Sequence, residues 1–585
     1  MKELKHLNKY FLNYKWLLIG GLFITILARV FALVTPRMIG ESTTAIEKYI
    51  TGEVTDPSLV RDELITNILL ILGATLISAF FTFLMRQTFI VVSRHIEYDL
   101  KNEIYRKYQD LSLNFYKKNR TGDLMNRISE DVSRVRMYLG PAIMYSVQTG
   151  ILFIVVIPYM LAQAAELTLY VLAPLPILSY AIYKLSVAIN RRSTIVQQYL
   201  SKLNTFTQES FSGISVIKSY SLEPQTNTAF VELSNGSKEK NIDLVRVQAF
   251  FFPLMVLLIG ASNLLVIFVG GQQFISGQIA DLGIIVEFLL YVNMLTWPVA
   301  TVGWVTSIVQ QAEASQERIN EFLKEVPQIQ NPSSAPEKVD GKISFKNVTF
   351  TYEDTGITAL KNLSFEIHSG ETLAIIGKTG AGKSTILELI GRLYDVKHGE
   401  ILIDDKPIDQ MNLKALRQSI GYVPQDAFLF SSSIRDNIRF GKEDATDKEV
   451  IEAAKNAAVH KNIMGFSKGY DTVLGERGIT LSGGQKQRVS IARAIIHDPK
   501  ILLFDDCLSA VDTETEEEIL SNLFKISRNK TTIIVSHRIS SAKNADKIII
   551  LEGGEILQIG SHQELIGQQG YYKELYLKQL SEKEM

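Results

Sequence analysis

Residues 373–385, Leu-Ala-Ile-Ile-Gly-Lys-Thr-Gly-Ala-Gly-Lys-Ser-Thr, decide the fold of the C-terminal half of this 585-residue chain. An apolar strand runs directly into a glycine-rich loop of the pattern GxxxxGKS, and an amphipathic helix follows. The backbone N–H groups of such a loop surround phosphates, the lysine adds positive charge, and the serine hydroxyl reaches Mg²⁺. The stretch therefore predicts a phosphate-binding site formed by Gly377, Thr379, Gly380, Ala381, Gly382, Lys383, Ser384 and Thr385.

Two further motifs follow the loop. Residues 501–506, Ile-Leu-Leu-Phe-Asp-Asp, form an apolar strand that ends in two carboxylates. In a phosphate-loop enzyme Asp505 holds Mg²⁺ through its water shell, and Asp506 is placed to polarise the attacking water. Between loop and strand, residues 481–488 form a small-residue turn that opens a helix, with Ser482 as a good N-cap. This turn predicts either a second anion-binding helix end or an ordinary capped helix start.

The surroundings of these motifs predict an α/β domain. From Ile343 onward, short β-rich runs alternate with helical segments. Before it, a polar stretch with three prolines predicts a helical exit followed by a linker. We expect a linker over 313–340 and an α/β nucleotide-binding domain over 341–585.

The N-terminal 312 residues have a different character and predict an all-α transmembrane domain. The mean hydropathy of the whole chain, +0.11, is intermediate between soluble and membrane proteins. A span needs roughly 20 mostly apolar residues. Six stretches qualify, and they are about 16–40, 64–90, 138–161, 164–188, 248–275 and 282–309.

Charge predicts the orientation of these spans. The N-terminal segment and the two long connections, about 91–137 and 189–247, are rich in Lys and Arg, whereas the loop near 41–63 is acidic. By the positive-inside rule, both termini and both long connections are cytoplasmic. The 61 basic and 62 acidic residues give a net charge of −1, and nothing in this balance points to nucleic acid.

Both long connections show helical periodicity, and each contains a turn-prone break, at 115–124 and at 208–214. Short transverse helices at these breaks are suited to docking on the nucleotide-binding domain and carrying its motion to the spans. A plain solvent-exposed helical hairpin explains the same pattern equally well.

Taken together, the motifs resemble those of half-size ABC exporters of the multidrug and lipid exporter group, and the resemblance covers nearly the whole chain. Residues 377–385 resemble the Walker A motif, 481–485 (LSGGQ) the ABC signature, and 501–506 the Walker B motif. Tyr352 matches the aromatic residue that stacks on adenine. The remaining matches are Gln425 for the Q-loop, His537 for the switch histidine, 509–512 for the D-loop, and 472–476 for the exporter segment that faces the coupling helices.

The resemblance implies an ATP hydrolase coupled to the export of amphipathic small molecules or lipids across the cytoplasmic (inner) membrane by alternating access. It implies a helical ABC-specific subdomain within the α/β nucleotide-binding domain. It also implies ATP and Mg²⁺ as cofactors, a second half-transporter as partner, and the lipid bilayer as surroundings. Mg²⁺ is then held by Ser384, Gln425 and Asp505, and catalysis involves Asp506, His537 and Gln425. The nucleotide also contacts Tyr352, Gln425, Ser482, Gly484, Gln485 and Asp512, with the signature residues facing the site of the other subunit.

Asp506 departs from the family pattern, in which glutamate is usual. An aspartate is one methylene shorter, and a misplacement of about 1 Å costs on the order of a hundredfold in rate. Two interpretations stay open: a homodimer with two slow working sites, or the degenerate-site subunit of a heterodimeric exporter. A further alternative is a regulatory membrane protein in which ATP binding, with little hydrolysis, switches conformation.

Overall fold

A computed structural model describes residues 2–475, 478–507 and 513–584 of the chain. The chain divides into two compact units. The first contains Met1–Gln109 and Gly122–Glu325, and the second contains Asp110–Thr121 and Val326–Met585. The second unit therefore includes a short segment that lies far from the rest of it in sequence.

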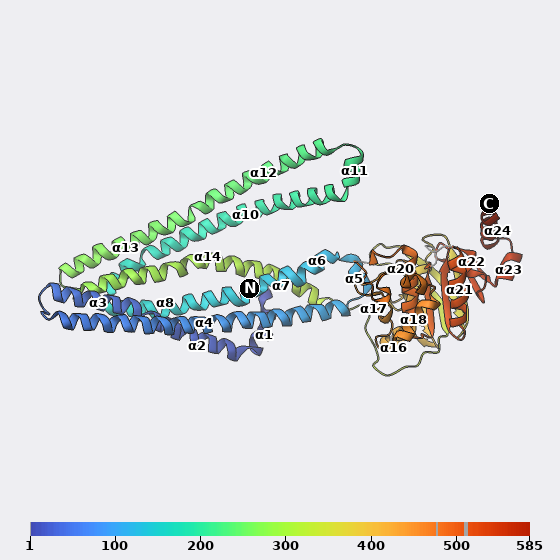
Figure 1. Cartoon of the computed structure of the whole chain (residues 1–585), viewed down its shortest axis with the longest axis horizontal. Helices are drawn as coiled ribbons and strands as arrows, with labels where there is room; N and C mark the ends of the chain where they lie inside the picture. The colour runs from blue at the N-terminus through green and yellow to red at the C-terminus, as the bar shows by residue number, and fades with distance from the viewer. Residues whose placement is uncertain (1, 476–477, 508–512, 585) are drawn as a thin grey trace. The chain divides into compact units, whose positions relative to one another are not determined.

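The first unit is helical throughout (Figure 1). Helix α10 and the α12–α13 pair lie side by side and run in opposite directions, joined by the short helix α11. The helical character predicted for both long connections is confirmed. The helices are α1 (Asn8–Asn13), α2 (Lys15–Ala32), α3 (Val34–Ile50), α4 (Pro57–Asp110), α6 (Thr121–Asn126), α7 (Val132–Met137), α8 (Ile143–Gln163), α9 (Ala165–Leu172), α10 (Pro174–Ser212), α11 (Ile214–Ser219), α12 (Glu223–Ala249), α13 (Phe251–Ile275) and α14 (Leu282–Lys324).

Among the described residues, five helical segments are long and apolar enough to cross a membrane. They contain five of the six predicted spans, and they are Lys15–Ile50, Pro57–Asp110, Thr121–Gln163, Glu223–Ile275 and Leu282–Lys324. The remaining prediction, 164–188, falls on α9 and the start of α10. The helix is interrupted at Ala173, and Pro174, Pro176 and Lys184 dilute its apolar character. This sixth span stays a prediction.

The apolar surface of the first unit points outward as well as inward. Leu76 on α4, Ile154 on α8 and Phe268 on α13 are each more than 60% exposed. In water such a surface is costly, whereas hydrocarbon solvates it as well as a protein core does. This distribution is typical of helices that face lipid.

One buried polar contact ties the first long connection to α14. The side chain of Asp131 is 5% exposed and pairs with the guanidinium of Arg318. Arg318 Nε donates to Asp131 Oδ2 at 3.0 Å, and Ser315 Oγ donates to Oδ1 at 2.9 Å. All three side chains lie outside the predicted spans.

The second unit contains two sheets, flanked by helices. A six-stranded sheet has the order β10-β9-β3-β8-β7-β6, and a four-stranded antiparallel sheet has the order β2-β1-β4-β5. The strands are β1 (Ile343–Thr351), β2 (Thr358–Ile367), β3 (Thr372–Gly377), β4 (His398–Ile403), β5 (Lys406–Pro407), β6 (Ile420–Val423), β7 (Ile501–Asp505), β8 (Thr531–Ser536), β9 (Lys547–Glu552) and β10 (Glu555–Gly560). The helices are α5 (Leu113–Lys118), α15 (Lys383–Ile390), α16 (Leu413–Gln418), α17 (Ile434–Arg439), α18 (Asp447–Asn456), α19 (His460–Met464), α20 (Gly483–Ile495), α21 (Thr513–Ile526), α22 (Ile539–Ala542), α23 (His562–Gly567) and α24 (Tyr571–Glu584).

The central strand β3 positions the functional loop. It pairs in parallel with both β8 and β9, and Ile375 lies opposite Val535 on one side and Ile549 on the other. All six residues of β3 are buried, as expected for a parallel strand covered on both faces. Because β6, β7, β8 and β3 run in the same direction, the loops that follow their carboxyl ends meet at one edge of the sheet. The α/β fold predicted for this part of the chain is confirmed.

Candidate nucleotide-binding site

The loop between β3 and α15 is fixed by close backbone contacts. At Gly377 an added Cβ would lie 2.2 Å from the carbonyl oxygen of Leu551 on β9. At Gly382 it would lie 2.4 Å from the carbonyl oxygen of Ala359, and the backbone there has a φ of +97°. Only glycine adopts such a conformation without strain. These two residues let the chain turn from a buried strand into α15.

Lys383 is held inside this loop. Its side chain is buried, and its Nζ donates to the carbonyl oxygens of Gly377 at 2.7 Å and Lys378 at 3.0 Å. Burial lowers the pKa of Lys383, and the neighbouring carboxylates of Asp506 and Asp505 oppose this shift. A buried ammonium curled back onto its own loop is well placed to bind an incoming phosphate group.

Ser384 and Asp505 join two elements at the sheet edge. Ser384 Oγ, in the first turn of α15, donates to Asp505 Oδ1 at the end of β7 at a distance of 2.9 Å. Asp505 is buried, and burial, with repulsion from Asp506, raises its pKa to about 6. Hydroxyl and carboxylate oxygens are the ligands that Mg²⁺ prefers. A divalent cation here would offset the cost of a buried carboxylate, so the donor set fits a metal ion.

Asp506 and His537 lie next to this pair. Asp506 Oδ2 is 3.8 Å from His537 Nε2, and the backbone N–H of Asp506 donates to the carbonyl oxygen of Val535 at 3.0 Å. The backbone of Asp506 has a φ of +43°, a left-handed conformation that is uncommon for a residue with a side chain. Burial raises the pKa of Asp506, while His537 and Lys383 act to lower it.

Tyr352 closes the other end of the site. Its hydroxyl donates to a carboxylate oxygen of Glu388 on α15 at 2.9 Å, and it also lies 2.9 Å from Thr385 Oγ1. Its ring contacts Phe350 edge-on at a centroid distance of 4.9 Å. The aromatic ring is therefore held beside the helix that begins with Lys383.

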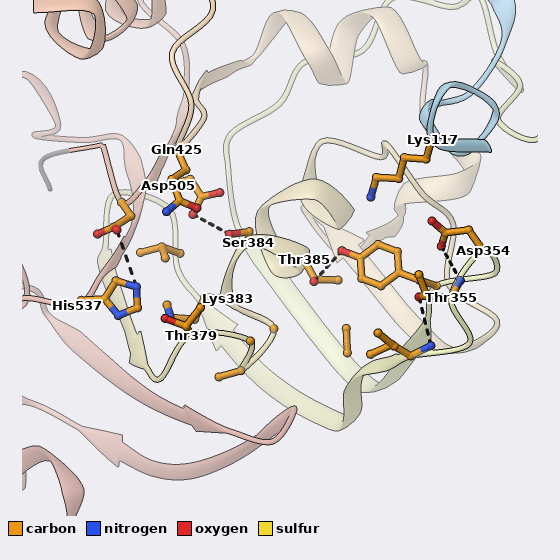
Figure 2. A pocket seen from close by; sticks show the side chains of 18 residues that line it. Lys117, Asp354, Thr355, Thr379, Lys383, Ser384, Thr385, Gln425, Asp505 and His537 are labelled. Atoms are coloured by element: carbon orange, nitrogen blue, oxygen red, sulfur yellow. Dashed lines mark hydrogen bonds and ion pairs between the residues drawn. The ribbon is translucent and has the colours of Figure 1, made fainter. Parts of the chain in front are cut away.

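These side chains line one cavity of about 420 Å³ (Figure 2). The structure brings together most of the predicted residues there, from α15, β7 and the loops that follow β1, β3, β6, β7 and β8. The predicted residues that line the cavity are Tyr352, Thr379, Gly380, Ala381, Gly382, Lys383, Ser384, Thr385, Gln425, Asp505, Asp506 and His537. Gly377 contributes through its carbonyl oxygen, which Lys383 contacts.

The signature residues do not line this cavity. Ser482 caps α20 in a capping box: Ser482 N donates to Gln485 Oε1 at 3.0 Å, and Gln485 N donates to Ser482 Oγ at 3.3 Å. Gly484 lies in the first turn of the same helix. The capped helix start predicted for this turn is confirmed, and the predicted contact with a second subunit's nucleotide stays a prediction. Asp512, like Glu476 of the segment 472–476, lies outside the described residues.

Sequence reasoning missed several lining residues. Asp354, Thr355, Ile357 and Ala359 follow Tyr352 closely, so the aromatic match was the signal that could have found them. Lys117 also lines the cavity. It lies more than two hundred residues from Tyr352 in the sequence, and no local pattern indicates its position.

The chain belongs to the ABC transporter family. The model of the ABC transporter transmembrane region matches residues 18–299, and the ABC transporter model matches residues 360–509. The protein is accordingly a multi-pass membrane protein that binds ATP and couples its hydrolysis to transport.

Individual relatives are similar to this chain over nearly its full length. The multidrug resistance-like ATP-binding protein MdlA of Escherichia coli (strain K12) is 33% identical over 577 residues, 98% of this chain and 96% of that protein. The uncharacterized ABC transporter ATP-binding protein YknU of Bacillus subtilis (strain 168) is 40% identical over 481 residues, 82% of each chain. A solved structure of a bacterial Atm1-family ABC exporter with ATP bound superimposes with a TM-score of 0.80 at 27% identity, covering 96% of this chain and 99% of that one.

Proposed function

We propose that the protein exports amphipathic small molecules or lipids, working as a dimer of half-transporters by alternating access. The observation that carries this proposal is the nucleotide cavity, because it places a buried lysine, a serine–aspartate pair and a histidine on one sheet edge. The multidrug name of the E. coli relative and the exporter fold of the solved neighbour support the direction and the substrate class.

Mg²⁺ binding belongs to this proposal. Ser384 Oγ and Asp505 Oδ1 would hold the ion, with the side-chain amide oxygen of Gln425 from the same cavity. The ion neutralises charge on the transferred phosphoryl group when it is bound. Lys383 binds and orients the phosphates, Asp506 orients the attacking water, and His537 lies beside Asp506 to position it.

Two exposed surfaces favour a partner subunit. The tip around α11 presents Phe211 and Tyr220, which are 71% and 74% exposed. In the second unit Phe428, Phe430 and Phe440 form an exposed aromatic patch, with centroid distances of 5.2 Å and 4.7 Å between successive rings. Patches of exposed aromatic side chains mark interaction sites. We propose that the α11 tip of each half-transporter docks on the aromatic patch of the other.

The charge pattern supports a choice of membrane and an orientation for the chain. We propose the cytoplasmic membrane, with both termini and the nucleotide-binding domain on the cytoplasmic side, because the basic residues gather in the termini and long connections. In this arrangement ATP reaches its site from the cytoplasm. We further propose a transmembrane domain over 1–312 with six spans, a linker over 313–340, and the nucleotide-binding domain over 341–585.

The test is the Mg-ATPase activity of the purified chain reconstituted in lipid. We expect activity that Lys383→Ala abolishes, because the phosphate-binding ammonium is lost. An unchanged rate in Lys383→Ala would contradict the assignment of the cavity.

Asp506 favours a second candidate, the degenerate subunit of a heterodimeric transporter. Its carboxylate is one methylene shorter than the usual glutamate and leaves a 3.8 Å separation from His537. The ATPase activity of the unmodified chain and of the variant Asp506→Glu distinguishes an active half-transporter from a degenerate subunit. Negligible activity of the unmodified chain, raised on the order of a hundredfold by the glutamate, supports the degenerate subunit. Vigorous activity of the unmodified chain contradicts it.

A further inference from the structure

The nucleotide cavity contains one side chain from the N-terminal part of the chain. Of the described residues that line it, Lys117 comes from α5, and all the others lie between Tyr352 and His537. Helix α5 belongs to the second unit, although it follows α4 directly in the sequence.

Several contacts fix α5 beside Tyr352. Leu113 packs against the hydrophobic core of the second unit. The side-chain amide of Asn114, which is buried, donates to Gln328 Oε1 and to Glu353 Oε2, both at 3.2 Å. Residues three and four apart share one face of a helix, so these anchors turn Lys117 toward the same side.

The ammonium group of Lys117 lies in a notch between two aromatic rings. Its Nζ is 4.6 Å from the ring centroid of Tyr352 and 4.9 Å from that of Tyr394. The two rings are perpendicular, with centroids 5.6 Å apart. Among the described residues, the contacts recorded for the Lys117 ammonium group are those with these two rings. A cation held only by ring faces keeps its N–H donors available to a ligand.

The position of Lys117 in the cavity indicates which part of a bound nucleotide it would contact. Figure 2 shows Lys117 on the Tyr352 side of the cavity, whereas Lys383 and His537 lie on the other side. The phosphate-binding loop surrounds the Lys383 side. The Tyr352 side therefore faces the base and ribose, whose ring nitrogens and hydroxyl oxygens accept hydrogen bonds.

We propose that Lys117 is a nucleotide-binding residue whose ammonium group donates a hydrogen bond to the base or ribose of bound ATP. The inference rests on the proposed function of this cavity. Since α5 is joined through Ser112 and Leu111 to the end of α4, the same contact makes the first cytoplasmic connection a direct sensor of nucleotide occupancy.

The test compares two probes on the full-length chain, ATP and inorganic tripolyphosphate, which carries the phosphates without base or ribose. In Lys117→Met we expect the Kd for ATP to rise about tenfold, the usual effect of losing one charge-assisted hydrogen bond. The Kd for tripolyphosphate is expected to stay within about twofold, since the phosphate contacts persist. Lys118→Met is the matched control, and Lys117→Arg is expected to recover most of the ATP affinity.

A measurement on the unmodified chain complements the variants. We expect ATP to slow amide hydrogen exchange in α5, and tripolyphosphate to leave it unchanged. An equal loss of affinity for both probes in Lys117→Met would overturn the proposal, because it would place the effect on the phosphates. An unchanged ATP affinity would also overturn it and leave Lys117 as a packing residue. If the unmodified chain bound neither probe, the proposed function itself would fail.

Discussion

The conformation of the loop between β3 and α15 depends on the absence of a side chain at Gly382. Its φ is +97°, and an added Cβ would lie 2.4 Å from the carbonyl oxygen of Ala359, which leaves no room for alanine. We expect Gly382→Ala to destabilise the nucleotide-free domain by about 2–3 kcal/mol, from backbone strain and displacement of β2. Gly380 has a similar φ of +82° but open space around it, so Gly380→Ala is expected to cost only about 1 kcal/mol. Thermal unfolding compares the two, and equal losses would contradict the steric explanation.

Most residues of the candidate site could be predicted because they belong to short contiguous sequence motifs. The residues from Gly377 to Thr385 are contiguous, and Asp505 and Asp506 end a strongly apolar strand. Such signals need no knowledge of the tertiary fold. Lys117 carried no such signal, because its place in the cavity depends on the docking of α5 through Leu113 and Asn114.

Among the elements, α14 and the first long connection are joined by an ion pair whose two side chains differ in exposure. The side chain of Asp131 is 5% exposed, whereas that of Arg318 is 43% exposed. Arg318→Met leaves a buried carboxylate without its cation, and we expect a loss of about 3 kcal/mol. Asp131→Asn leaves a guanidinium that reaches water, and we expect about 1 kcal/mol or less. The measurement is thermal inactivation in detergent, with Glu130→Gln at an exposed pair as control. A larger loss for Asp131→Asn would contradict this account.

Element boundaries show where sequence patterns become insufficient. The long helices α4 and α14 follow from continuous helical periodicity. The break between α9 and α10 at Ala173 was not predicted, although Pro174 and Pro176 were its available signal. The first break was interpreted either as a short docked helix or as part of a solvent-exposed hairpin. Helix α5 is a docked helix, because Leu113 packs against the core of the second unit.

In the whole molecule, ATP hydrolysis in the second unit drives the movement of a substrate across the membrane by the first. Membership of the ABC transporter family establishes that ATP hydrolysis is coupled to transport. Sequence patterns did not specify the substrate, because the exposed apolar residues of the spans are numerous and chemically alike.

The most direct test uses proteoliposomes containing the purified chain and a fluorescent amphipathic probe. Mg-ATP is supplied outside, where it reaches the molecules whose nucleotide-binding domains face outward. We predict ATP-dependent accumulation of the probe inside the vesicles, and its loss in Lys383→Ala. Hydrolysis of ATP without net movement of either the probe or labelled lipid would contradict the account.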